Sequence, residues 1–131
     1  MPSRKVLTVD DDLATRRLIK LVLELELDDV DVLEASDGKE CLNIVNNQPV
    51  DLILLDVNMP GISGWDVLRI LRSTKPLASI PTIIVSGEYP DPDLIGQLQP
   101  EGCFGKPFDV FELASCVRKR LQNGCSSLSS H

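Results

Sequence analysis

The sequence has few aromatic residues, fewer basic than acidic residues, and no long apolar run. Aromatic residues make up only 4% of its 131 residues, so the core must consist of aliphatic side chains. No apolar stretch approaches the roughly 20 residues that a membrane-spanning helix needs. The net charge of −7 argues against binding nucleic acid by neutralising its phosphates. We therefore expect one soluble cytoplasmic domain that binds neither nucleic acid nor a membrane.

The cysteines lack the spacing of a metal site or a disulfide framework. The four are Cys41, Cys103, Cys116 and Cys125, and no two of them form a C-x-x-C pair. Isolated cysteines of this kind are typical of reduced thiols in a cytosolic protein.

The stretch from residue 50 to residue 61 is the strongest structural indication in the chain. Leu52 to Leu55 is a continuous apolar run, which is typical of a strand buried on both faces of a parallel sheet. Asp56 follows directly, and Pro60-Gly61 then favours a turn. Because ligands bind outside the carboxyl ends of strands in open α/β sheets, Asp56 is a candidate site residue. The simpler alternative is a carboxylate that only caps the next loop.

Strand-like and helix-like segments alternate along the whole chain. Strands are predicted at residues 6–9, 30–35, 52–55, 82–85 and 102–105, and a helical pattern follows each of them. Five such repeats predict an α/β fold with a doubly wound five-stranded parallel sheet and helices on both faces.

The spacing of apolar residues predicts which helix faces are buried. In the first helix, Leu18, Leu21, Val22 and Leu25 are spaced as one apolar face. The last helix has a longer stripe, made of Val110, Leu113, Ala114, Val117 and Leu121.

Capping signals mark several helix ends. Asp37 and Asp109 are each followed three residues later by a glutamate, Glu40 and Glu112, as in a capping box. Gly124 is expected to end the last helix.

The segment from residue 88 to residue 101 is irregular. It contains three prolines and a glycine, so only a short helix fits, at about residues 93–98. We expect one domain at residues 1–122 and a disordered, serine-rich tail at residues 123–131.

Polar residues collect at the carboxyl ends of the predicted strands: Asp10, Asp11, Asp56, Ser86 and Lys106. Clustered carboxylates repel one another unless a cation joins them, and Mg²⁺ is a cation that prefers oxygen ligands. A lysine and a hydroxyl are suited to holding phosphate oxygens, and a carboxylate can itself be the nucleophile that forms an aspartyl-phosphate. The set therefore favours phosphoryl transfer over loop capping.

In combination and order, these residues resemble the receiver domain of response regulators in two-component signalling. The motifs that carry the resemblance are Val9-Asp10-Asp11-Asp12, Asp37-Gly38, Leu55-Asp56-Val57-Asn58-Met59-Pro60-Gly61, Gly64, Val85-Ser86-Gly87 and Lys106-Pro107-Phe108. They cover about residues 5–121, and the resemblance implies the flavodoxin-like receiver fold.

The resemblance also implies a role for each site residue. Asp56 would be the phosphoacceptor, with Mg²⁺ held directly by Asp11, through water by Asp10, and by the backbone carbonyl of Asn58. Ser86 would hydrogen-bond the phosphoryl group, and Lys106 would pair with it. The donor would be a histidine kinase or a phosphotransfer protein, and phosphorylation would switch binding to a downstream effector by a monomer or weak dimer. The domain would be a phosphoacceptor switch, with only self-catalysed phosphoryl uptake and autodephosphorylation.

The chain departs from the family pattern at Cys103. Receivers usually have an aromatic residue there, three residues before the lysine, and it rotates with activation. Phe104 is one residue later, where strand alternation points it to the other face of the sheet. The irregular fourth helix also predicts an atypical partner surface.

Two positions near the phosphoacceptor predict a short-lived phosphorylated state. Asn58 lies two residues after Asp56, and Glu88 lies two residues after Ser86. Both side chains could orient an attacking water. The pairing is similar to that of chemotaxis-type receivers, whereas the simpler alternative is a Glu88 that points into solvent.

Other function classes remain alternatives. A pseudo-receiver would bind partners without being phosphorylated, and Cys103 keeps that interpretation open. A phosphohydrolase of the haloacid-dehalogenase type would need a second aspartate where Asn58 stands. A flavodoxin-like flavin binder would need a Ser/Thr-rich phosphate loop after the first strand.

Overall fold

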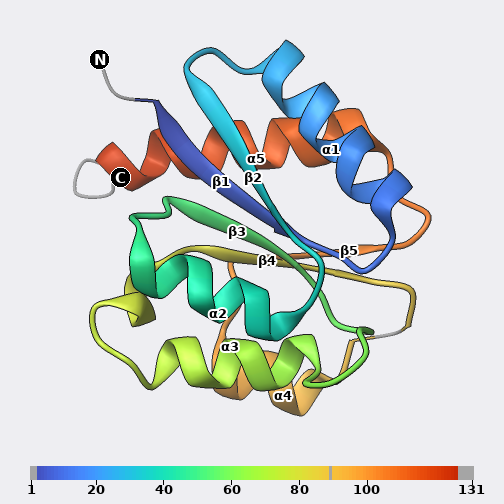
Figure 1. Cartoon of the computed structure of the whole chain (residues 1–131), viewed down its shortest axis with the longest axis vertical. Coiled ribbons are helices and arrows are strands. Elements are labelled where there is room, and N and C mark those ends of the chain that lie inside the picture. Colours follow the sequence, from blue (N-terminus) through green and yellow to red (C-terminus); the bar gives the residue numbers. More distant parts are fainter. Residues whose placement is uncertain (1–2, 89, 127–131) are drawn as a thin grey trace.

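The computed structural model describes residues 3–88 and 90–126, which form one sheet flanked by helices (Figure 1). The strands are β1 (Arg4–Val9), β2 (Val30–Ala35), β3 (Leu52–Asp56), β4 (Thr82–Ser86) and β5 (Gly102–Gly105). The helices are α1 (Leu13–Glu26), α2 (Gly38–Asn47), α3 (Gly64–Arg72), α4 (Pro92–Leu98) and α5 (Val110–Ser126), with a 3₁₀ turn, η1 (Leu77–Ser79).

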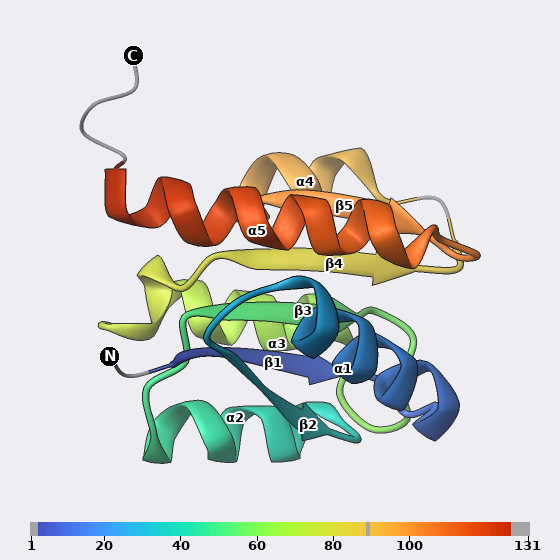
Figure 2. The ribbon, with the colours of Figure 1, turned by 90° about the horizontal axis from the view of Figure 1, so that it is seen from above.

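All five strands are parallel, in the order β2-β1-β3-β4-β5 (Figure 2). The chain adds β2 on one side of β1, then crosses over to add β3, β4 and β5 on the other side. This order confirms the doubly wound five-stranded parallel sheet that the sequence predicts. It also places the carboxyl ends of all the strands at one edge of the sheet.

The helices cover both faces of the sheet, with α1 and α5 on one face and α2, α3 and α4 on the other (Figure 1). Alternate residues of β3 enter the two cores: Leu52 and Leu54 pack on the α1/α5 side, and Ile53 and Leu55 on the opposite side. All four are at most 1% exposed. Burial on both faces is the physical reason for the unbroken apolar run.

The predicted helix caps are present. The Glu40 backbone N–H donates to Asp37 Oδ1 at 2.8 Å, and the Ser36 backbone N–H donates to Glu40 Oε1 at 2.6 Å. At the start of α5, Asp109 Oδ1 accepts from the backbone N–H groups of Phe111 and Glu112. These bonds satisfy donors that the first helical turn leaves without a partner.

The prediction for the buried face of α1 is wrong in part. The buried residues are Ile19, Val22 and Leu23, whereas three predicted core leucines are exposed: Leu18 by 47%, Leu21 by 57% and Leu25 by 73%. The helix sequence contains two overlapping apolar stripes that each fit a helical period. Periodicity does not decide between them, and packing against β1 and β2 selects the stripe of Ile19 and Leu23.

The remaining boundaries agree with the prediction to within one residue, except at the start of β1 and the end of α5. Strand β1 begins at Arg4, two residues before the predicted start. Helix α4 is short, as expected, and begins one residue early at Pro92. Helix α5 continues to Ser126, two residues beyond the end predicted at Gly124, so it enters the segment predicted to be a tail. The rest of that segment, residues 127–131, lies outside the described residues. Within residues 3–88 and 90–126, none of the helices has the length and apolarity to cross a bilayer.

Candidate functional site

The strand order brings the polar residues of four strand ends together. Strands β1 and β3 are neighbours, and Val9 is paired with Leu55, so Asp10 and Asp56 emerge side by side. Strand β4 lies next to β3 and ends at Ser86, and β5 lies next to β4 and leads into Lys106. The five residues predicted from sequence thus share one edge of the sheet.

Three carboxylates form the centre of this site. Asp10, Asp11 and Asp56 each place one carboxylate oxygen so that the three atoms lie within 4.8 Å of one another. Asp10 is 2% exposed and Asp56 is 3% exposed, whereas Asp11 is exposed. Two nearly buried carboxylates and one exposed carboxylate therefore make a cluster of negative charge that reaches the surface at Asp11.

Lys106 reaches this cluster from the residue that follows β5. Its Nζ lies 2.9 Å from Asp10 Oδ2 and 3.4 Å from Asp56 Oδ2. Its backbone N–H donates to the Ser86 carbonyl at 2.7 Å, which ties the loop after β5 to the end of β4. One positive charge is therefore shared by two buried carboxylates.

The site shifts the pKa values of its central pair. Burial and the neighbouring charge of Asp10 raise the pKa of Asp56, against the opposing effect of Lys106. Burial by itself would lower the pKa of Lys106, but its hydrogen bond to Asp10 and the charges of both aspartates outweigh burial and raise it. An ionised Asp56 is therefore short of positive charge even with Lys106 in place.

The oxygen donors fit a divalent cation such as Mg²⁺. Three carboxylates within reach of one ion are hard oxygen ligands, and Mg²⁺ is commonly held by one or two carboxylates with waters and phosphate oxygens. Burial and the charge of Asp10 raise the pKa of Asp56, and a bound cation would oppose both effects by favouring the ionised carboxylate. Asp12 does not belong to this group; its carboxylate accepts from the Thr15 hydroxyl in the first turn of α1.

The β3–α3 loop holds Asp56 from the other side. The backbone N–H of Asn58 donates to Asp56 Oδ1 at 3.2 Å. Gly64 packs so closely that a Cβ there would lie 2.3 Å from the Asp56 carbonyl oxygen. The carbonyl of Asn58 remains a predicted ligand.

Ser86 and Glu88 begin a hollow next to the carboxylates. The Glu88 backbone N–H donates to Ser86 Oγ at 3.0 Å, and that hydroxyl donates to the Glu88 carbonyl at 3.1 Å. The hollow measures about 400 Å³, and Cys103 and Lys106 also line it. Phe104 points to the opposite face and packs with α1 and α5, as strand alternation predicts. Burial raises the pKa of the Cys103 thiol, so this cysteine is not an activated nucleophile.

Sequence analysis missed one residue that orders the site. Arg16, on α1, donates from Nη1 to the Asp10 carbonyl at 2.6 Å and from Nε to Glu34 Oε1 at 3.1 Å. Its side chain is only 12% exposed. No motif links Arg16 to a strand end six residues earlier, so the contact emerges only when α1 folds back on the sheet.

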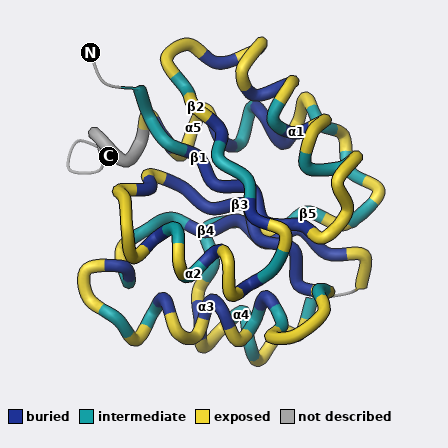
Figure 3. Tube along the Cα trace, in the orientation of Figure 1, coloured by how far each residue is buried: buried dark blue, intermediate teal, exposed yellow. Residues whose placement is uncertain are grey.

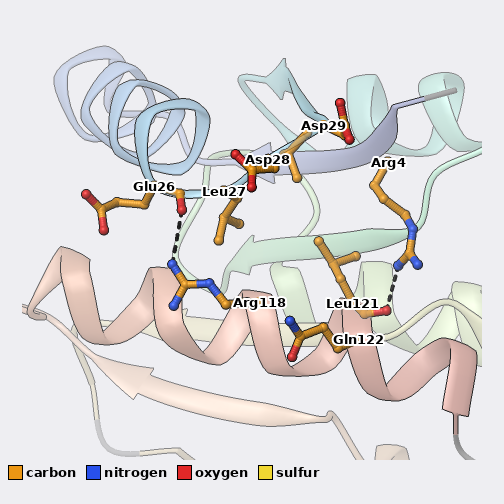
Figure 4. Close-up of a pocket in the computed structure, with 9 residues that line it drawn as sticks. Arg4, Glu26, Leu27, Asp28, Asp29, Arg118, Leu121 and Gln122 are labelled. Carbon is orange, nitrogen blue, oxygen red and sulfur yellow. Dashed lines mark hydrogen bonds between the residues drawn. The ribbon is translucent and has the colours of Figure 1, made fainter. Parts of the chain in front are cut away.

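A second hollow, of about 340 Å³, lies at the opposite edge of the sheet (Figure 4). Arg118 donates to the Glu26 carbonyl at 3.0 Å and Arg4 donates to the Leu121 carbonyl at 2.6 Å, so both arginines fasten α5 to the rest of the fold. Both contacts are structural, and the residues that favour phosphate chemistry all lie at the other edge.

Comparison with known proteins identifies one family. The family model described as the response regulator receiver domain matches residues 6–118. Sporulation initiation phosphotransferase F of Bacillus subtilis is 32% identical over 124 residues, which cover 92% of this chain and 96% of that protein. The chemotaxis protein CheY of Pseudomonas aeruginosa is 33% identical over 117 residues, 88% of this chain and 94% of CheY.

Larger relatives and solved structures agree with that match. The DNA-binding response regulator MtrA of Mycolicibacterium paratuberculosis is 32% identical over 121 residues, covering 91% of this chain but only 52% of MtrA. The receiver domain of the Francisella response regulator 1452 has a TM-score of 0.82 and 31% identity, covering 93% of this chain and 99% of that one.

Proposed function

The chain belongs to the response regulator receiver domain family, and we propose that it accepts a phosphoryl group on Asp56 in a Mg²⁺-dependent reaction. The donor would be a histidine kinase or a histidine phosphotransfer protein. Phosphorylation would change how the domain binds a downstream effector, which makes it a switch and not a turnover enzyme.

The observation that carries this proposal is the charge arrangement around Asp56. Asp56 is 3% exposed, its carboxylate lies 3.4 Å from Lys106 Nζ, and it belongs to a group of three carboxylates. A group that only capped a loop would not need a neighbouring lysine and two further acids. A phosphoacceptor needs the lysine because positive charge must offset the phosphoryl oxygens, and it needs the acids because they would hold a cation that adds to that charge.

In the proposed transfer, an Asp56 carboxylate oxygen bonds to phosphorus as the phosphorus–nitrogen bond to the donor histidine breaks. The donor imidazole leaves and regains its proton from solvent. Lys106 pairs with a phosphoryl oxygen, and the Ser86 hydroxyl donates to another. The Asn58 backbone N–H already donates to Asp56 Oδ1, so it holds the nucleophile in place.

Asp10, Asp11 and Asp56, with the Asn58 carbonyl, would hold the magnesium ion. When bound, Mg²⁺ supplies the charge that lets the phosphoryl group approach an anionic carboxylate.

Intact mass measured after incubation with a small-molecule phosphodonor tests the proposal. With Mg²⁺ we expect the mass of one added phosphoryl group, and without Mg²⁺ no detectable uptake. Asp56→Asn should abolish uptake, because an amide is not a comparable nucleophile. Asp66→Asn is the matched control, since it removes an exposed carboxylate at the start of α3 and should leave uptake unchanged.

Uptake that persists in Asp56→Asn would show that another residue is the acceptor. A parent chain that takes up no phosphoryl group at all would favour a pseudo-receiver instead.

A further inference from the structure

The loop between β3 and α3 is held at both ends but runs over the surface in between. At its start, Val57 is buried and the backbone N–H of Asn58 donates to Asp56 Oδ1 at 3.2 Å. At its end, the backbone N–H of Gly64 donates to the Val57 carbonyl at 3.0 Å. Most residues of the loop, 57–63, are exposed (Figure 3). The contacts that the middle of the loop makes therefore decide where its predicted metal ligand, the Asn58 carbonyl, lies.

Ile62 is where this loop contacts α2. A Cβ added to Gly38, the first residue of α2, would lie 2.7 Å from Ile62 Cγ1 and 2.9 Å from Ile62 Cδ1. The same atom would lie 2.6 Å from Val67 Cγ2, on α3. The Ile62 side chain thus occupies space that only a glycine leaves open. A hollow of about 350 Å³ beside this contact is lined by Leu42 of α2 and Pro60 of the loop, so the loop is not packed on α2 along its whole length.

The start of α2 is also tied to the loop that carries the other predicted metal ligands. The backbone N–H of Asp10 donates to the carbonyl of Ala35, the last residue of β2, at 3.1 Å. The turn that follows is fixed by the cap of α2, in which Ser36 donates to Glu40 and Glu40 donates to Asp37. Helix α2 therefore begins at a fixed place relative to Asp10, and the loop after β3 packs on its first residue.

We propose that Gly38 and Ile62 are positioning residues of the metal site. Their contact sets the separation between the loop that carries Asn58 and the loop that carries the aspartates after β1. This inference rests on the proposed function, because the ion and its carbonyl ligand belong to that proposal. Neither residue touches the ion. Mg²⁺ demands a nearly ideal octahedron of oxygen ligands, so a small displacement of one ligand loop weakens its binding.

The burial of the two side chains above Gly38 separates positioning from simple packing. Val67 is 0% exposed and belongs to the core between α2 and α3, so its contact with Gly38 contributes to the stability of the fold. Ile62 is 36% exposed and lies outside both helices. The contact of Ile62 therefore contributes less to stability, and its main consequence is the place of the loop.

Isothermal titration of the full chain with Mg²⁺ tests this role. Ile62→Ala removes the two atoms that lie on Gly38 and adds no strain. It should weaken Mg²⁺ binding by about ten-fold, as expected when a group that holds a ligand is lost. The melting temperature without metal should change little, because the side chain is partly exposed. Ile70→Ala is the matched control, since Ile70 is 42% exposed on α3 and should leave the affinity at the parent value.

Gly38→Ala tests the same contact from the side of α2. The added methyl group displaces Ile62, so Mg²⁺ binding should again weaken, and here stability falls as well because Val67 is also crowded. In the double variant Gly38→Ala/Ile62→Ala, the methyl group enters the space that the shortened side chain leaves. The double variant should therefore bind Mg²⁺ more tightly than Gly38→Ala alone, whereas independent losses would multiply. Urea unfolding establishes beforehand that each variant folds.

Two outcomes would overturn the positioning role alone. One is an Ile62→Ala variant that binds Mg²⁺ as tightly as Ile70→Ala, and the other is a double variant in which the two single losses multiply. In either case, a parent that binds Mg²⁺ and takes up a phosphoryl group leaves the proposed function standing. A parent that binds no Mg²⁺ would overturn the positioning role together with the metal site of the proposed function.

Discussion

Arg16 shows how a single residue outside any motif can set the geometry of the site. Its guanidinium joins the Asp10 carbonyl to Glu34, and so anchors the loop that carries two of the predicted metal ligands to β2. Asp10 is further held by the Asp12 backbone N–H at 2.8 Å. Loss of the arginine would release the loop without removing any ligand.

We predict that Arg16→Met weakens Mg²⁺ binding by about ten-fold, as expected when an outer partner of a ligand is lost. Arg17→Met is the control, because Arg17 contacts the same Glu34 but not the loop. Isothermal titration with Mg²⁺ gives both affinities, and thermal melts without metal separate weaker binding from a weaker fold. Equal affinities in the two variants would contradict the role given to Arg16.

At the scale of the elements, the close approach of α3 to β3 holds the phosphoacceptor loop. A Cβ on Gly64 would lie 2.3 Å from the Asp56 carbonyl oxygen and 2.7 Å from Val57 Cα, and backbone atoms cannot move aside as a flexible side chain can. A Cβ added to Gly96, in α4, would have no atom within 4 Å apart from its own helix backbone and chain neighbours. Two helical glycines therefore have opposite surroundings.

We predict that Gly64→Ala destabilises the fold by about 3 kcal/mol, from overpacking against backbone. Gly96→Ala should instead stabilise it by about 0.5–1 kcal/mol, because alanine is the better helix former and nothing obstructs it. Urea unfolding of both variants and the parent provides the comparison. A Gly64→Ala variant as stable as the parent would mean that α3 is free to move away from β3.

The loops that follow β3 and β4 bear on the lifetime of the proposed phosphorylated state. Glu88 is exposed and lines the hollow shared with Ser86 and Lys106, and its backbone is held by the Ser86 hydroxyl. Asn58 lies across the site on the other loop. We predict that Asn58→Arg and Glu88→Leu each slow the loss of phosphate by several-fold, because neither replacement orients an attacking water as the parent residue does.

The decay of phosphorylated protein after removal of the donor measures this lifetime. The control is Glu112→Leu, which replaces an exposed acidic residue in the first turn of α5. Glu101 is less suitable as a control because it pairs with Arg72. Decay as fast as that of the parent in both site variants would show that the lifetime is set elsewhere.

At the scale of the whole molecule, the sequence predicts what depends on chain order and misses what depends on packing. Apolar runs and turn residues predicted all five strands, and the order of polar strand ends predicted which side chains meet at one edge. The rotation of α1 about its own axis was not predictable from two equally regular apolar stripes. The Arg16 contact and the approach of Gly64 were missed as well, since both depend on how α1 and α3 pack back against the strands that precede them.

The whole fold should also respond to metal, because the repulsion at one edge of the sheet opposes folding. Burial and the charge of Asp10 raise the pKa of Asp56 above its value in the unfolded chain. The folded state therefore holds this proton more tightly than the unfolded state does. By linkage, the Asp56 contribution to stability without metal falls as pH rises from the unfolded pKa through the higher folded pKa. A cation that binds only the folded site reverses this loss.

We predict that Mg²⁺ raises the melting temperature at pH 7, by the equivalent of about 2.7 kcal/mol at a concentration one hundred times its dissociation constant. The shift should shrink as pH falls through the raised pKa of Asp56, because protons then compete with the ion for the same oxygens. Asp11→Asn should remove most of the shift, whereas Asp66→Asn should keep it, since Asp66 lies on the exposed face of α3. Thermal melts with and without Mg²⁺ measure the shift for the parent at pH 4 and pH 7 and for the Asp11→Asn and Asp66→Asn variants at pH 7. A parent whose melting temperature at pH 7 does not change at saturating Mg²⁺ would mean that the three carboxylates are not a metal site.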